Sequence, residues 1–103
     1  MDAKRVLTFR AVAHQRSFSR AARELSLSQP SVSNQVAALE REIGARLLRR
    51  EPGGLSLTPA GAILLEHADA ISERFRLAGA QLAEVAGEAV SYTHLTLPTT
   101  PYV

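Results

Sequence analysis

The stretch from residue 17 to residue 41 constrains the fold more than any other part of the chain. Its sequence is SFSRAARELSLSQPSVSNQVAALER. The spacing of its apolar residues predicts two short amphipathic helices, at 18–25 and from 29 to 43, joined by the tight polar turn 26–28. A glycine at position 44 fits the left-handed residue that commonly ends a helix. A helix pair with so short a turn favours a small helical domain of the helix-turn-helix type.

The second helix of this pair is expected to carry two different faces. It begins at Gln29, because the Ser28 hydroxyl can accept a backbone N–H and Pro30 is tolerated in a first helical turn. One face is an apolar stripe formed by Val32, Val36, Leu39 and Ile43. The opposite face carries short polar side chains: Gln29, Ser31, Ser33, Asn34 and Gln35. Because such a surface can meet base edges, we predict that this helix reads DNA.

Two further elements are expected to pack on the helix pair. Residues 3–15 predict a preceding helix, with Phe9 on its apolar face. Residues 47–57 predict a small hairpin, because two brief apolar runs flank the turn residues Pro52-Gly53-Gly54. A two-stranded ribbon is marginal alone and must pack on the helices. This combination predicts a winged helix.

The expected wing carries a cluster of positive charge. Arg46, Arg49 and Arg50 could reach phosphate or the minor groove, although a charged, solvated strand edge would look the same. Residues 1–57 contain ten Lys or Arg and five Asp or Glu, a net charge of +5, whereas residues 58–103 contain two and five, a net charge of −3. This asymmetry indicates a polyanionic partner for the first half, with an ordinary Arg-rich surface as the alternative.

Residues 59–89 predict one long helix, with Thr58 as its cap and Pro59 in its first turn. Its apolar positions recur at alternating spacings of four and three, as in a heptad seam. The seam consists of Leu64, Ala68, Ile71, Phe75, Ala78, Leu82 and Val85. A small domain cannot bury so narrow a seam alone, so we expect a second copy of the chain to cover it. The alternative is a helix that lies across its own domain.

Residues 90–103, VSYTHLTLPTTPYV, depart from this pattern, because charge disappears and threonine and proline become frequent. From Ser91 on, the segment resembles the translated adapter read-through found at the ends of many fragmentary sequences. We interpret it as a disordered or non-native tail. The predicted organisation is therefore a winged domain at 1–58, a linker and dimerisation helix at 59–89, and this tail.

Several classes of function find no support in the sequence. There is no cysteine for a disulfide or a thiolate metal site, and the three histidines show no ligand spacing. There is no glycine-rich phosphate loop and no catalytic constellation, so we expect neither an enzyme nor a cofactor. The N-terminus lacks the apolar core of a signal peptide, and no run approaches the roughly 18 apolar residues of a membrane span. We expect a cytoplasmic protein, associated with the nucleoid.

Four motifs follow one another in the chain: SFSRAA, LSLSQPSVSNQ, LEREIGARL and LTPAG. With them, residues 1 to about 88 resemble the N-terminal domain of LysR-type transcriptional regulators. The resemblance implies a mainly α fold, a winged helix-turn-helix of three helices and a two-stranded wing, followed by a coiled-coil linker helix. It also implies sequence-specific binding of double-stranded DNA for transcription regulation.

The resemblance implies a role for individual residues. The third helix would enter the major groove, with contacts from Gln29, Pro30, Ser31, Ser33 and Asn34. Ser17, Ser19 and Arg20 would touch the DNA backbone, with Arg20 as a phosphate partner. The implied partners are a pseudo-palindromic duplex and a second copy of the chain, joined through the long helix as an antiparallel pair. Such regulators also bind a small-molecule effector, expected only in a full-length parent with a C-terminal domain.

Two positions depart from the family pattern. Asn34 and Gly53 stand where family members often carry arginine, so a minor-groove contact from the wing would fall to Arg49 or Arg50. A second interpretation is a winged-helix module for protein interaction or dimerisation without specific DNA binding. The polar face of the third helix counts against it, because protein-binding grooves usually carry apolar anchors.

Overall fold

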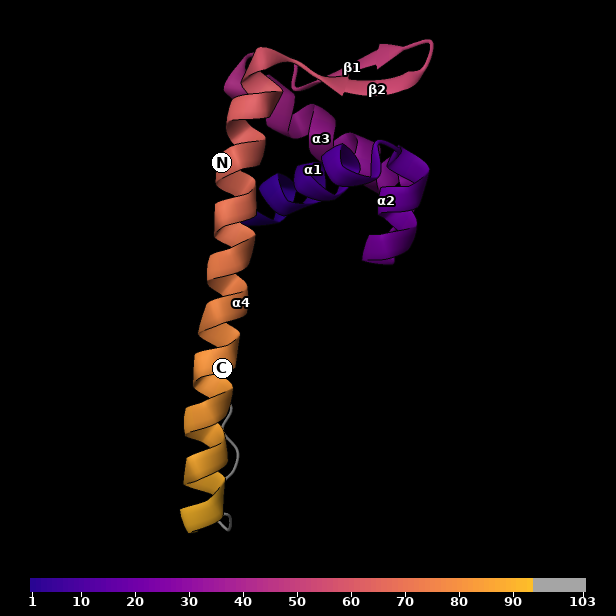
Figure 1. Ribbon diagram of the computed structural model, residues 1–103. Helices are drawn as coiled ribbons and strands as arrows, with labels where there is room; N and C mark the ends of the chain where they lie inside the picture. Colours follow the sequence, from indigo (N-terminus) through magenta and orange to yellow (C-terminus); the bar gives the residue numbers. More distant parts are fainter. Residues whose placement is uncertain (94–103) are drawn as a thin grey trace. The chain divides into compact units, whose positions relative to one another are not determined.

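The computed structural model describes the backbone of residues 1–93 and the side chains of residues 1–87. The chain divides into two compact units, of which the first is Met1–Ile71 and the second begins at Ser72. We call the first the winged unit. Its elements, and the helix that continues into the second, are drawn in Figure 1: α1 (Ala3–Gln15), α2 (Phe18–Leu25), α3 (Gln29–Ile43), β1 (Leu48–Glu51), β2 (Gly54–Leu57) and α4 (Pro59–Thr93). The predicted mainly α winged helix-turn-helix is confirmed.

Short polar side chains cap the starts of α2 and α3, as predicted for Ser28. The Ser17 hydroxyl accepts the N–H of Arg20 at 3.0 Å at the start of α2, and the Ser28 hydroxyl accepts the N–H of Ser31 at 3.2 Å at the start of α3. The end of α3 falls at Gly44, whose φ of 83° is accessible to glycine at little cost. Local sequence therefore fixes the lengths of these helices.

The core of the winged unit lies between α1, α2 and α3, which pack against one another (Figure 1). Its largest fully buried side chains are Phe9, Leu39, Leu47, Val12 and Val32. Three members of the predicted apolar stripe of α3 are buried, but the fourth, Ile43, is 39% exposed. Ile43 occupies the last turn of α3, beside the exposed Gly44. Ile43 thus lies on the predicted stripe but outside the buried core.

The hairpin is antiparallel, with Leu48 opposite Leu57 and Glu51 opposite Gly54. Its two-residue turn is Pro52-Gly53, so Gly54 belongs to β2 rather than to the turn. The hairpin is anchored at its base, because Leu48 is buried and Leu57, opposite it, packs against the core. The predicted wing is thus present, held at its open end.

α4 begins as predicted, because the Thr58 hydroxyl accepts the N–H of Gly61 at 3.0 Å. Its early residues belong to the winged unit: Ala68 is fully buried, and Leu64 packs against the same core. α4 extends to Thr93, so residues 90–93, which were assigned to the tail, are helical. The remainder of the predicted tail, residues 94–103, lies outside the described residues. None of the helices described is both long enough and apolar enough to cross a membrane.

Candidate nucleic-acid interface

The first two turns of α3 present the predicted reading residues at the surface. Gln29, Pro30 and Asn34 are exposed, and Ser31 and Ser33 are partly exposed. None of these side chains is acidic, so the surface carries no charge that would repel phosphate. The geometry is that of a polar helix face open to a partner.

The polar face is narrower than the sequence suggested. Gln35 was expected on it, but its Oε1 accepts a hydrogen bond of 2.7 Å from the hydroxyl of Thr8 on α1. Thr8 is 3% exposed, so this bond satisfies a polar group in the core. Gln35 is therefore bonded to α1 rather than free on the polar face of α3.

The start of α2 lies beside the start of α3. The Ser19 hydroxyl donates a hydrogen bond of 3.2 Å to Oε1 of Gln29, which brings the two predicted contact segments together. Ser17 uses its oxygen to cap α2, but its hydroxyl proton remains a donor. Within the described part of the chain, no carboxylate lies at ion-pair distance from the exposed Arg20. Its charge is available to an external anion.

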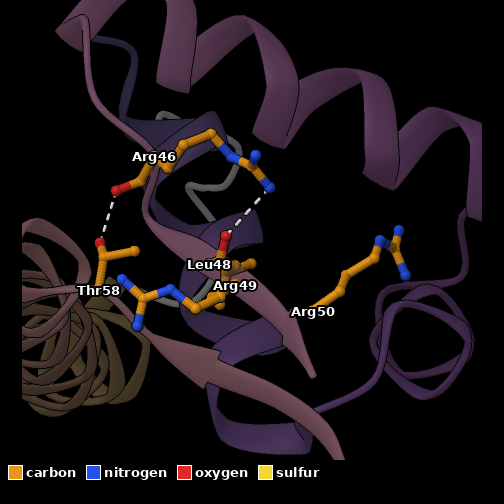
Figure 2. A pocket seen from close by; sticks show the side chains of 5 residues that line it. All are labelled: Arg46, Leu48, Arg49, Arg50 and Thr58. Carbon is orange, nitrogen blue, oxygen red and sulfur yellow. Dashed lines mark hydrogen bonds between the residues drawn. The ribbon is translucent and has the colours of Figure 1, made fainter. Parts of the chain in front are cut away.

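The two exposed arginines of β1 point to opposite sides of the hairpin, as alternate strand residues do (Figure 2). The guanidinium carbon of Arg50 lies 4.9 Å from the ring centroid of Phe18, at the start of α2. This cation–π contact restrains the Arg50 side chain, which is otherwise long and mobile. Arg49 has no such partner among the described aromatic residues. Arg50 is therefore the better preorganised of the two.

Ser33, Arg50 and Phe18 line one shallow groove between α3 and the hairpin. The floor and walls of this groove also include Val36, Ala37, Glu40, Arg46, Leu48 and Leu55. A polar residue of the predicted reading helix and an arginine of the wing thus border the same surface. This is a juxtaposition that residue spacing alone could not establish.

Glu40 joins α3 to the base of the wing, a contact that the sequence did not reveal. Glu40 lies in the last turns of α3, but its side chain is only 16% exposed. Its Oε2 accepts the backbone N–H groups of Leu47 at 2.8 Å and Leu48 at 3.3 Å. No local motif predicts these hydrogen bonds, because they depend on the path of the chain after Gly44.

Arg46 is engaged differently from the other wing arginines. Its Nη2 donates to the carbonyl oxygen of Leu48 at 3.2 Å (Figure 2), and its Nε lies 3.6 Å from Oε2 of Glu40. The side chain is 71% exposed but turned back on the base of the hairpin. Arg46 therefore partly balances the charge of Glu40, which leaves Arg49 and Arg50 as the outward-facing charges of the predicted cluster.

The first part of α4 is joined to α1 by a charged cluster. The side chains of Arg10 and His14 both donate to Oδ1 of Asp69, each at 2.7 Å. The hydrogen bond from His14, with a further one from Arg10, lowers the pKa of Asp69 below the usual value of 3.8, against the opposing effect of burial. The His14 side chain is 48% exposed and makes this contact from the last turn of α1. Among the described residues, no three His, Asp or Glu side chains converge on a metal site.

The predicted dimerisation seam divides into two parts. Ala68 is fully buried in the core of the winged unit, so its side chain cannot contribute to a surface for a second copy. Beyond it the seam is exposed: Ile71 is 36%, Phe75 60%, Leu82 68% and Val85 62% exposed, and Ala78 is also exposed. Large apolar side chains in a row on one helix are what a helical partner would cover.

The winged unit of the chain matches a family of known proteins. The model of the family described as "Bacterial regulatory helix-turn-helix protein, lysR family" matches residues 3–62. The HTH-type transcriptional regulator HdfR of Yersinia enterocolitica is 35% identical over 100 residues, which cover 97% of this chain and 33% of HdfR. The HTH-type transcriptional regulator BudR of Raoultella terrigena is 51% identical over 61 residues, which cover 59% of this chain and 21% of BudR.

Two solved structures are similar along nearly their whole length. The complex of BenM_DBD with catB site 1 DNA has a TM-score of 0.77 and 29% identity, and covers 84% of this chain and 97% of that chain. The complex of CbnR_DBD with DNA has a TM-score of 0.71 and 36% identity, and the match covers 84% of this chain and 99% of that chain. The chain spans about a third or less of the length of the curated relatives named above.

Proposed function

The chain belongs to the lysR family of bacterial regulatory helix-turn-helix proteins, and on that premise we propose that it binds double-stranded DNA sequence-specifically and thereby regulates transcription. In this proposal α3 enters the major groove, and two copies of the chain occupy a roughly palindromic site. Their half-sites would lie about one turn of the duplex apart. Such a role would place the protein in the cytoplasm, at the nucleoid.

One observation carries the proposal more than the others: the exposed, acid-free face at the start of α3 lies beside the wing arginine Arg50. Polar side chains on a helix can read base edges, while arginines fix the register on the phosphates. The likeness to BenM_DBD and CbnR_DBD, both solved with DNA, supports the same use of this face. A purely protein-binding surface would instead offer apolar anchors.

The contacts divide by chemistry. We assign base-edge contacts to the side chains of Gln29 and Ser33, and contact with a thymine methyl group to Pro30. Ser31 and Asn34 complete this reading set on α3. We assign phosphate contacts to the following residues: Ser17, Ser19, Arg20, Arg49 and Arg50. Phosphate contacts position the protein, whereas the α3 contacts carry the sequence preference.

Self-association is proposed through the exposed part of the α4 seam, from Ile71 to Val85. Leu64 and Ala68, which the sequence placed in the seam, serve mainly to hold α4 on the winged unit. A two-fold arrangement of two winged units would present two copies of α3 to one duplex. The expected site symmetry follows from this arrangement.

The salt dependence of binding tests the proposal. If each copy neutralises three to five phosphates, the log–log slope of affinity against salt should be roughly −5 to −9. Fluorescence anisotropy of a labelled duplex, titrated with the full chain at several salt concentrations, measures this slope. Absence of binding, or a binding constant that does not respond to salt, would contradict the proposal and favour a protein-interaction module.

A further inference from the structure

The Glu40 carboxylate is largely withdrawn from solvent and accepts two backbone hydrogen bonds. Its side chain is 16% exposed, whereas those of Glu42 and Asp69 are each 43% exposed. Withdrawing a carboxylate from water is unfavourable unless hydrogen bonds compensate. Here the compensation comes from the N–H groups of Leu47 and Leu48, which both donate to Oε2. The carboxylate of α3 is thus bonded directly to the base of the wing.

The base of the wing depends on a small number of such bonds. Residues 44–47 connect α3 to β1 without regular secondary structure, so the helix itself does not fix the direction of the hairpin. On one side the segment is bonded to α3 through Glu40. On the other it is bonded to the start of α4, because Thr58 donates its hydroxyl to the carbonyl oxygen of Arg46 at 2.5 Å and its N–H to that of Leu47 at 3.1 Å.

We propose that Glu40 is a positioning residue for DNA binding: its bonds to Leu47 and Leu48 fix the wing relative to α3. Arg50 follows Leu48 by two residues, so a rotation at the base of the hairpin would carry its guanidinium away from Ser33 and the shared groove. The inference rests on the proposed function. It adds a residue that touches no DNA yet decides whether α3 and the wing meet the same duplex.

The negative charge of Glu40 should weaken DNA binding, whereas its proposed positioning role should strengthen it. The two effects can therefore be told apart by substitution. A negative charge near DNA repels phosphate, so its removal should by itself strengthen binding. Glu42 supplies the matched control, because it lies in the same last turns of α3 and carries the same charge. Its carboxylate contacts the N-terminal amine at 2.9 Å and, within the described part of the chain, makes no ion pair with the hairpin.

The experiment compares full-chain variants on a fluorescein-labelled duplex that the wild type has enriched from a random pool. We expect Glu40→Ala to bind about fivefold more weakly or worse, with a salt slope smaller by about 0.9 for each phosphate that the variant no longer neutralises. Glu42→Ala should bind as well as the wild type or more tightly. Glu40→Gln should bind as well as the wild type or more tightly, because its amide oxygen can still accept both N–H groups and the negative charge is gone.

A double-mutant cycle of Glu40 and Arg50 distinguishes the positioning role from a general effect on stability. If Glu40 positions Arg50, then Arg50→Ala should weaken the wild type but change the Glu40→Ala variant little. Amide exchange of Leu47 and Leu48 in the DNA-free protein should be faster in Glu40→Ala and unchanged in Glu42→Ala. If Glu40→Ala does not fold, Glu40→Asp replaces it, because its carboxylate keeps the charge but is one methylene too short.

The outcomes separate the proposed function from the positioning role. Wild-type protein that enriches no duplex overturns the proposed function, and this inference with it. A wild type that binds DNA while Glu40→Ala and Glu42→Ala bind equally well overturns the positioning role alone. Fully additive effects of Glu40→Ala and Arg50→Ala, at equal helix content by circular dichroism, would also overturn it.

Discussion

Gly61 lets the first turn of α4 lie directly against the base of the wing. A Cβ atom at this position would overlap the carbonyl oxygen of Leu47, which is a backbone atom and cannot rotate away. The same oxygen accepts the N–H of Thr58, so moving it would break a hydrogen bond. The requirement for glycine here is steric, and it belongs to the motif LTPAG that opens α4.

Gly61→Ala should therefore lower the free energy of unfolding by about 1–3 kcal/mol, as overpacking does. Gly79 is the matched control within the same helix, because a Cβ there meets no atom within 4 Å. Gly79→Ala should raise the free energy of unfolding by about 0.5–1 kcal/mol through helix propensity. Urea denaturation followed by circular dichroism measures both. A Gly61→Ala variant as stable as the wild type would refute the close contact.

Asp69 makes stability depend on pH. Because its pKa is lowered in the folded state, mainly by the hydrogen bond from His14, the charged carboxylate stabilises the fold at pH values above its unfolded pKa, near 3.8. That contribution is lost as pH falls through the folded pKa. It is small, because the side chain is 43% exposed and solvent screens the pair.

Asp69→Asn should consequently be less stable than the wild type at about pH 5, and the difference should shrink as pH falls through the lowered folded pKa of Asp69. Urea denaturation at a series of pH values measures it. The exposed carboxylate of Glu73 also has a lowered pKa, because Arg76 donates a hydrogen bond to it. Glu73→Gln on α4 is therefore measured alongside Asp69→Asn. A stability difference between Asp69→Asn and the wild type that is independent of pH would contradict this explanation.

At the scale of elements, the helix boundaries and the wing were predictable because their signals are local. Ser28 and Gly44 bound α3, and Thr58 caps α4, each through groups only a few residues away. The parts that the sequence did not reveal depend on distant contacts. Gln35 turns inward because it accepts a hydrogen bond from Thr8 on α1, which is 27 residues away in the sequence. Glu40 reaches backbone groups whose position is set only after the chain has folded back.

The contact between Phe18 and Arg50 joins α2 to the wing, and it gives an element-scale prediction. Phe18→Leu keeps an apolar side chain but removes the ring face over which the guanidinium lies. Binding of duplex DNA should weaken by about two- to fivefold, the magnitude of one exposed cation–π contact. Phe18→Tyr keeps the ring and should bind normally in the same anisotropy assay. Equal affinities of the Leu and Tyr variants would contradict a positioning effect of the ring.

At the scale of the whole molecule, the apolar seam of α4 has a buried part and an exposed part that its period could not separate. A helix packed on its own domain and a helix packed on a second copy both need apolar residues at spacings of three and four. Only the structure reveals that Ala68 is in the core while Phe75, Leu82 and Val85 are largely exposed. The sequence therefore predicted the helix and its apolar face correctly, but not the point at which this face passes from the core to the surface.

The combined substitutions Ile71→Asp and Phe75→Asp should convert a dimer into monomers, because two pairs of like charges would be buried in the interface. Sedimentation velocity measures the change. Ala70→Asp combined with Ala80→Asp is the matched control, since both positions are exposed on α4 but lie off the seam. A dimer that survives the seam substitutions, or dissociates equally in the control, would refute the assigned interface.

Selection of binding sites from a random pool of duplexes by the full chain is the sharpest test of α3 as a reading helix. We expect one enriched motif with two-fold symmetry and half-sites about one helical turn apart. We also expect Gln29→Ala and Ser33→Ala to relax the preference within each half-site, while Arg20→Ala weakens all sites alike. Failure of the wild type to enrich any motif, or enrichment of an unchanged motif by Gln29→Ala, would contradict the assignment of α3 as the reading helix.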